Sequence, residues 1–238
     1  VLWFDACLFD QTILLRHLVW LSSLKSRPAK LSMVCIGEFP GRPAFRGLGE
    51  LSPDELASLF PSRVPVADSM MRDANKIWIS MLSKQHGDLF ALAQAEFEGL
   101  PFMGDALREY LRQLPSLKNG LSALDERILE ALQAETLDPI ALFNCAASKT
   151  KHPYFGDTTL FRHVNELAAK AKPLLAIEGP GPLPVWNIDK SRLSAWKLAL
   201  TDFGRMALAG KFDTIAENGI DLAFGAFYLE GRSCLRFD

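Results

Sequence analysis

The chain has 238 residues, of which 49% are hydrophobic and 23% are charged, and its formal net charge at pH 7 is −2. This composition is that of a folded globular protein and excludes disordered and collagen-like chains, while the near-zero charge excludes a strongly basic coat and an acidic tail. A membrane-spanning helix needs about 18 consecutive apolar residues. The longest apolar stretch, residues 13–24, is interrupted by Arg16 and His17, so we expect no membrane partner.

The beginning of the chain predicts a βαβ unit. Residues 1–4 form a hydrophobic run typical of a buried strand, residues 11–24 carry apolar side chains partly at helical spacing, and residues 31–36 form a second hydrophobic run. Two such strands joined by a helix lie parallel in one sheet, with a right-handed crossover. Because the first run begins at Val1 instead of a methionine, we expect further residues upstream.

Helices complete the first half, which we predict to be an α/β domain over residues 1–118 with a small parallel sheet and a helical appendage. After a loop rich in glycine and proline, Ser52, Pro53 and Glu55 form the capping-box pattern of a helix start. Apolar residues that recur every three or four positions predict three further helices, over residues 67–83, 88–98 and 104–114.

The second half predicts an α+β, winged-helix-like domain over residues 119–238, entered through a turn-rich linker at residues 115–120. Ser122 and Asp138 are typical N-caps of the first two helices. Three short helices followed by a two-stranded hairpin is the winged-helix order, and the expected segments are residues 123–133, 139–147, 156–170, 173–177 and 196–200. A last helix and a terminal hairpin are expected over residues 201–210, 224–229 and 233–237.

The cysteines and histidines show no metal-binding spacing. Cys7, Cys35, Cys145 and Cys234 include no Cys-x-x-Cys pair, and the histidines lie near no pair of cysteines. A chain of this size can bury a core without disulfides, and it shows no secretory signal. We therefore expect four reduced thiols, a cytoplasmic location, and neither a metal site nor a cofactor.

Five segments spread over the chain resemble the bacterial domain-of-unknown-function family 1835: VLWFDACLFDQ, CIGEFPGRPAFRGLGELSPDELASLFPSR, LPSLKNGLSALDERILEAL, GDTTLFRHVNELA and LALTDFGRMALAGKFDTIAENGID. The resemblance implies an N-terminal α/β domain joined to a winged-helix-like half, with more sequence upstream. It implies no established activity. Where the family shows an acidic residue, His and Asp after the first strand, this chain has Asp5, Ala6 and Cys7, so a role of that histidine in relatives cannot be carried over.

Polar side chains follow both predicted parallel strands, where open α/β sheets bind their ligands. Asp5, Cys7 and Asp10 follow the first strand, and Glu38, Arg42 and Arg46 follow the second. If they share one rim, Asp5, Asp10 and Glu38 are the candidate catalytic residues for an anionic or metal-bound ligand. The alternative is structural: Asp10 caps the helix, Glu38 pairs with an arginine, and Cys7 packs as a small apolar group.

The segment from Lys149 to Lys197 has eight basic and four acidic side chains, a local balance of +4 in a chain of −2. If Phe161 and Val164 are buried, the third helix of this half turns polar side chains outward, where they could enter a DNA major groove. The predicted nucleic-acid contacts are Thr159, Arg162, His163, Lys170, Lys190, Arg192 and Lys197. Glu166 lies on the same predicted face and would repel phosphate.

These patterns lead to three functional hypotheses. The first is a regulatory protein that binds duplex DNA through the winged helix. The second is an enzyme or ligand-binding protein that acts on a nucleotide or another phosphate-containing ligand at the α/β sheet rim. The third is a protein-interaction module whose winged helix contacts another protein.

Overall fold

The computed structural model describes residues 1–26, 30–43, 45–83 and 87–237. The chain divides into two compact units, one of Val1–Tyr110 with His152–Tyr154 and the other of Leu111–Lys151 with Phe155–Asp238. The described residues combine helices with a three-stranded mixed sheet and two two-stranded sheets, so the fold is mixed α/β. None of the described helices has the length and hydropathy that a membrane span requires.

The first unit is built on a sheet with the strand order β1-β2-β3. Strands β1 (Leu2–Asp5) and β2 (Ser32–Ile36) are parallel, as the βαβ pattern predicts, and their register runs from Leu2 opposite Met33 to Asp5 opposite Ile36. The short strand β3 (Val64–Pro65) adds antiparallel to β2. The sequence did not predict β3, because two residues are too few for an alternating pattern.

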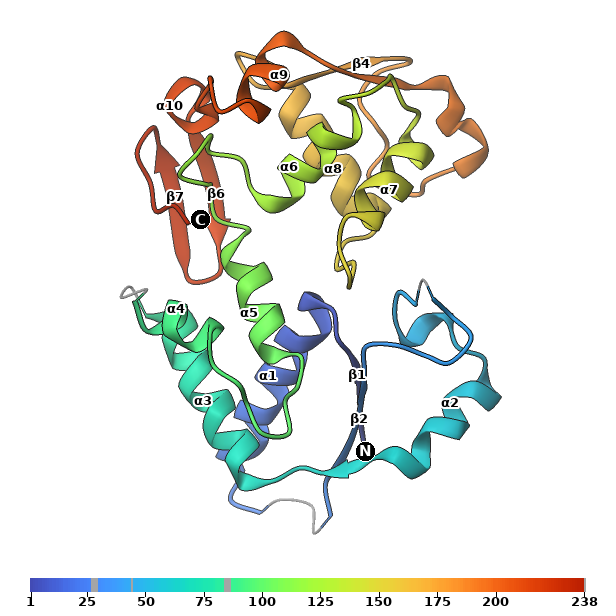
Figure 1. Cartoon of the computed structure of the whole chain (residues 1–238), viewed down its shortest axis with the longest axis vertical. Helices are drawn as coiled ribbons and strands as arrows, with labels where there is room; N and C mark the ends of the chain where they lie inside the picture. The colour runs from blue at the N-terminus through green and yellow to red at the C-terminus, as the bar shows by residue number, and fades with distance from the viewer. Residues whose placement is uncertain (27–29, 44, 84–86, 238) are drawn as a thin grey trace. The chain divides into compact units, whose positions relative to one another are not determined.

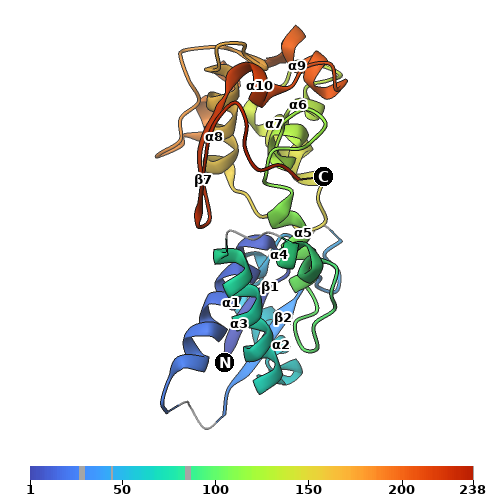
Figure 2. The same cartoon turned by 90° about the vertical axis from the view of Figure 1, so that its left-hand side faces the viewer.

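Helices cover both faces of this sheet (Figure 1). Helices α1 and α3 lie on one face, where they pack side by side (Figure 2), and α2 lies on the other. Side chains of strand β1 alternate between these faces: the Phe4 ring contacts the tilted ring of His17 on α1, and Trp3 lies beside Leu56 and Phe60. The helices of this unit are α1 (Leu8–Ser23), 3-10 helix η1 (Leu48–Glu50), α2 (Pro53–Leu59), 3-10 helix η2 (Phe60–Ser62), α3 (Asp68–Leu82), α4 (Gly87–Ala93) and α5 (Met103–Leu111).

The predicted capping box starts α2. The Ser52 hydroxyl accepts from the Glu55 backbone N–H at 3.3 Å, and the Glu55 carboxylate accepts from the Ser52 N–H at 2.7 Å. The Arg42 guanidinium donates to both oxygens of the same carboxylate at 2.9 Å. This pair ties the loop after β2 to the first turn of α2.

The second unit contains three helices that meet at a buried apolar core (Figure 1). Ser122 and Asp138 cap the first two helices, as predicted. Ile128, Leu142 and Val164, one from each helix, are fully buried. The elements are α6 (Ala123–Ala131), α7 (Pro139–Ser148), α8 (Asp157–Ala168), β4 (Leu175–Glu178), 3-10 helix η3 (Lys190–Ala195), β5 (Lys197–Leu200), α9 (Asp202–Leu208), α10 (Thr214–Asn218), β6 (Ile220–Phe224) and β7 (Phe227–Gly231).

Strands β4 and β5 form an antiparallel pair. Leu137, between α6 and α7, forms an antiparallel β-bridge with Leu198 of β5. The Leu137 N–H donates to the Leu198 carbonyl oxygen at 3.0 Å, and the Leu198 N–H donates to the Leu137 carbonyl oxygen at 2.8 Å. A single residue between the first two helices therefore extends the sheet that follows the third helix.

The end of the chain differs from the prediction. The terminal hairpin consists of β6 and β7, with Leu222 opposite Leu229, and it turns at Gly225, whose φ is +58°. The turn predicted at residues 230–232 is wrong, because residues 233–237 do not pair with the preceding strand and instead contact other parts of the second unit. There, Arg236 binds the Asp213 carboxylate and the Phe237 N–H donates to the Pro115 carbonyl oxygen.

Residues 115–120 are a folded turn within the second unit and not a linker between the units. The buried Asn119 side chain donates to the Ala207 carbonyl oxygen at 2.9 Å and accepts from the Leu121 N–H at 3.0 Å and the Ser116 hydroxyl at 2.6 Å. The Asn119 backbone carbonyl also accepts from the Thr214 N–H. One amide side chain thus holds the turn against α9.

Asn119→Ala should therefore lower the free energy of unfolding by roughly 2–3 kcal/mol, because it leaves buried backbone groups without partners. Urea unfolding followed by circular dichroism measures this loss. Asn144, exposed on α7, is the matched control, and Asn144→Ala should leave stability unchanged or slightly higher. An Asn119→Ala variant as stable as the control would contradict this role.

Candidate functional site

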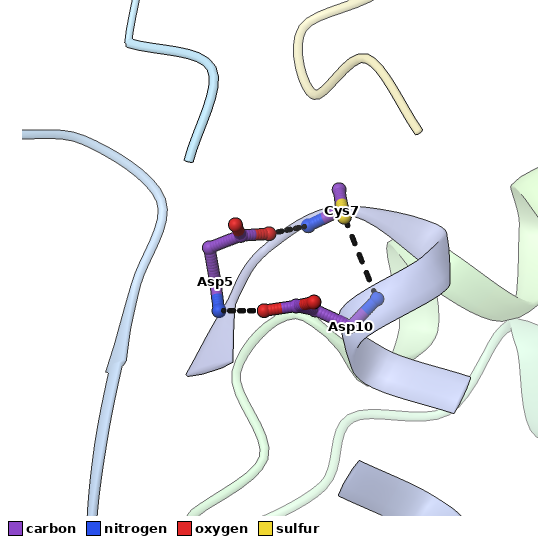
Figure 3. Close-up of side chains that lie close together, drawn as sticks. All are labelled: Asp5, Cys7 and Asp10. Carbon is purple, nitrogen blue, oxygen red and sulfur yellow. Dashed lines mark hydrogen bonds between the residues drawn. The ribbon is translucent and has the colours of Figure 1, made fainter. Parts of the chain in front are cut away.

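Three of the predicted rim residues meet at the end of β1. One potential ligand atom from each of Asp5, Cys7 and Asp10 lies within 4.8 Å of the others (Figure 3). Asp5 is the last residue of β1, Cys7 is the N-cap of α1, and Asp10 lies in its first turn. The tight connection between strand and helix brings the three side chains together.

Backbone amides already bind each of these side chains (Figure 3). The Cys7 N–H donates to Asp5 Oδ1 at 2.9 Å, the Asp5 N–H donates to Asp10 Oδ2 at 2.8 Å, and the Asp10 N–H donates to Cys7 Sγ at 3.4 Å. These bonds fix the cluster as part of the strand-to-helix turn. Its two carboxylates and thiol are of the types that can hold a metal ion.

The expected capping role of Asp10 is wrong: Asp10 lies inside the first turn of the helix. Helix α1 begins at Leu8, three residues earlier than predicted, and the extended Cys7 caps it through its sulfur atom. The Asp10 carboxylate instead reaches back to the end of β1. The sequence suggested Asp10 because aspartate is a far commoner N-cap than cysteine.

The environment of the cluster disfavours further charge. Burial, together with the nearby Asp5 and Asp10 carboxylates, raises the pKa of the Cys7 thiol to about 12 despite the hydrogen bond from the Asp10 N–H. Burial and the Asp5 charge also raise the pKa of Asp10. Cys7 is therefore a protonated thiol at neutral pH, and a protonated thiol is a poor nucleophile.

Gln11 ties this cluster to the neighbouring strand. Its buried amide donates to the Asp5 carbonyl oxygen at 2.6 Å and lies 3.4 Å from the Cys35 sulfur on β2. Burial raises the pKa of Cys35 to about 11. All four cysteines are free thiols in the structure.

The residues after β1 come together as expected, but those after β2 do not join them at a common rim. Glu38 is exposed and lies outside the cluster, and Arg42 is bound to Glu55 instead of Glu38. The loop after β2 approaches Asp5 through a glycine: a Cβ atom on Gly47 would overlap Asp5 Oδ2. The candidate catalytic residues Asp5 and Asp10 are therefore together, whereas Glu38 is apart from them.

The predicted nucleic-acid contacts lie on three elements of the second unit, apart from Lys170. Thr159, Arg162 and His163 are on α8, and Lys170 follows it. Lys190 and Arg192 are in η3, between the two strands of the β4–β5 hairpin, and Lys197 begins β5. Arg162 is exposed, but its guanidinium lies 3.8 Å from the Glu166 carboxylate, one turn further along the same face.

His163 faces inward, so its expected outward orientation is wrong. Its Nδ1 lies 2.9 Å from Oδ1 of Asp125 on α6, and about a fifth of each side chain is exposed. Burial alone would lower the pKa of His163, but the hydrogen bond and charge of Asp125 raise it overall. Burial opposes ionisation of Asp125 too, yet His163 and the Ser122 hydroxyl lower its pKa overall. The pair joins the first and third helices.

Two residues near these sites were not predicted from the sequence. Asp125 has no signal of its own, because its partner lies 38 positions away. Trp186 is 87% exposed in the loop between β4 and β5. Its position after a proline-rich segment and before polar residues could have indicated a tryptophan outside the core. It lies beside Asp157 and Thr158 at the start of α8.

No protein-family model matches the chain, and no curated protein matches it significantly. The resemblance described above therefore stays an expectation.

Gly47→Ala should lower the free energy of unfolding by about 2 kcal/mol, because the new methyl group overlaps the Asp5 carboxylate. The φ of Gly47, +141°, adds backbone strain. Part of this loss should disappear in an Asp5→Ala background, which a double-mutant cycle measures by urea unfolding. Gly49→Ala is the control, because Gly49 lies two residues further on, in η1, with open space around it. Equal costs of Gly47→Ala in both backgrounds would contradict the contact.

His163→Gln should lower the free energy of unfolding by roughly 1–2 kcal/mol near pH 6, where the Asp125–His163 pair is charged. The raised pKa of His163 means that its contribution is full below the ordinary histidine value of about 6.5 and is lost as pH rises through the higher folded value. The pKa of Asp125 is lowered in the folded chain. The contribution of Asp125 to the free energy of unfolding is therefore lost as pH falls below about 4.

The cost of His163→Gln should therefore be largest between about pH 4 and 6.5 and should shrink at higher pH. Urea unfolding between pH 4 and 9 measures this profile. His17→Gln is the control, because the His17 ring bonds the Ile13 carbonyl oxygen. A pH-independent difference between His163→Gln and the wild type would show that Asp125 does not hold a charged imidazole.

Proposed function

We propose that the second unit is a winged-helix module that binds duplex DNA in a regulatory role, with α8 as the helix that enters the groove. The observation that carries this proposal is the order of its elements. Helices α6, α7 and α8 are followed by the β4–β5 hairpin, and Leu137 between the first two helices pairs with Leu198 of that hairpin. The resemblance to a family with a winged-helix-like C-terminal half agrees with it.

Exposed side chains on α8 and in the β4–β5 loop support the proposal. Phe161 and Val164 are buried, and Arg162 is exposed on the opposite face of α8. Lys190 and Arg192 are exposed in η3. The hydrogen bonds of Asn165 to both backbone groups of Leu183 hold the loop against α8, so the helix and the loop can contact the same DNA.

The available positive charge is smaller than the sequence suggested. Lys149 pairs with Glu130 and Lys172 pairs with Glu217, so neither charge is fully available to phosphate. Arg162 is partly neutralised by Glu166. Of the eight basic residues between Lys149 and Lys197, five take part in none of these pairs: Lys151, Lys170, Lys190, Arg192 and Lys197. Lys170 is half-buried, the other four are exposed, and Lys197 lies opposite Glu178 across the hairpin.

We do not extend the proposal to catalysis at the β1 edge. Asp5 and Asp10 each accept a hydrogen bond from a backbone amide, Cys7 is held as a neutral thiol, and Glu38 lies apart. These groups serve the strand-to-helix turn, and nothing about them favours a phosphate-containing ligand.

Salt dependence tests the DNA-binding proposal. About four phosphate contacts predict that log affinity falls with log salt at a slope of roughly −3 to −4, from about −0.9 per contact. Fluorescence anisotropy with a labelled duplex, between about 50 and 200 mM salt, measures it. Lys190→Ala should weaken binding to all sequences and reduce the slope by about 1, whereas Glu166→Gln should tighten binding because it releases Arg162.

Lys76→Ala, which removes an exposed cation from α3 of the first unit, should change neither affinity nor slope. If the wild type does not bind duplex DNA even at about 50 mM salt, where electrostatic binding is strongest, the proposal is wrong. The second unit would then be assigned to protein contact.

A further inference from the structure

Trp186 is the most exposed large apolar side chain among the described residues. Its exposed fraction is 87%, and that of the neighbouring Val185 is 39%. A buried indole normally supplies a large part of a protein core. Exposing one in water forgoes that stabilisation, and a partner that covers it would recover it.

The loop that carries Trp186 is held in place on both sides. Before it, Asn165 of α8 binds both backbone groups of Leu183, and the Trp196 indole N–H donates to the Gly181 carbonyl oxygen at 2.7 Å. After it, the Asp189 carboxylate accepts from the Ser191 N–H at 3.0 Å and caps η3. Anchored ends restrict the positions of the indole, which lowers the entropy cost of using it as a contact.

A hollow of about 400 Å³ lies between Trp186 and the start of α8, lined also by Asp157 and Thr158. The hollow is open to solvent, so it can receive one group of a larger molecule but does not enclose a ligand. Asp157 is the charged residue among those that line it. A carboxylate repels phosphate, so the hollow favours an uncharged planar or apolar group over the DNA backbone.

We propose that Trp186 packs against the bases or sugars of bound DNA, as an aromatic contact beside the helix that enters the groove. This inference rests on the proposed function and adds the chemistry of one contact to it. Few cations on this face are unpaired, and Asp157 and Glu166 oppose phosphate. A contact that does not depend on charge would add to the affinity, and an aromatic side chain inserted between base steps or packed on the sugars supplies it.

Binding measured at two salt concentrations separates this contact from the ionic ones. Trp186→Ala should lower the affinity for a labelled duplex about tenfold at both 50 and 200 mM salt, with an unchanged salt slope, because stacking releases no counterions. Trp186→Phe should recover most of the affinity. Lys190→Ala, in contrast, should change the slope. Because Trp186 is exposed, its replacement should leave the circular dichroism spectrum and thermal midpoint unchanged.

Trp20→Ala is the matched control, since Trp20 is 50% exposed on α1 of the first unit, and it should bind like the wild type. If the wild type binds DNA and Trp186→Ala binds equally well, the inference is wrong and the proposed function stands. A loss that appears only at low salt would also overturn it. If the wild type does not bind DNA at all, the proposed function fails and this inference fails with it.

Discussion

The two hydrogen bonds between Leu137 and Leu198 determine what the second unit can present to a partner. They attach the β4–β5 hairpin to the connection between α6 and α7, and Leu198 is fully buried beneath them. A two-stranded hairpin alone is marginal in water. With this extra pairing and the packing of its inner side chains, it becomes a fixed part of the helical core, and the loop it carries is held beside α8.

Charge in this unit is used largely for internal contacts. The Asp125–His163 pair joins α6 to α8, Arg236 binds Asp213 near the end of the chain, and Lys172 binds Glu217. A count of basic residues along the sequence treats each as available to a partner, whereas the folded chain has already paired several. The local excess of +4 therefore overstates the positive potential of the surface.

Signals from adjacent residues predicted most helices and strands. Features that depend on contacts between residues far apart in the sequence were not predicted. Ser52, Ser122 and Asp138 mark helix starts because capping depends on a few adjacent residues. The parallel β1–β2 pair follows from the strand–helix–strand order. In contrast, the terminal hairpin was misplaced because residues 233–237 alternate like a strand, and their actual partners, Asp213 and Pro115, lie far away in the sequence.

The same distinction explains the candidate sites. Asp5, Cys7 and Asp10 were grouped correctly because they lie within six residues, but Glu38 could be placed beside them only by assuming how the loop after β2 folds. That loop instead brings Gly47 against Asp5 and directs Arg42 to Glu55. His163 was assigned to the surface by helical spacing alone, which cannot show that Asp125 faces it from another helix.

The proposed binding of DNA by a near-neutral chain faces a specific energetic constraint. Phosphate contacts bind by releasing counterions, and their number here is limited by the acidic residues on the same face. More affinity must then come from contacts that release water instead of ions, and such contacts need an apolar group that is exposed and held in position. Among the described residues of α8 and the β4–β5 loop, Trp186 combines high exposure with an anchored backbone. In the proposed complex, a few cations would therefore orient the duplex and the indole would supply the part of the affinity that salt does not remove.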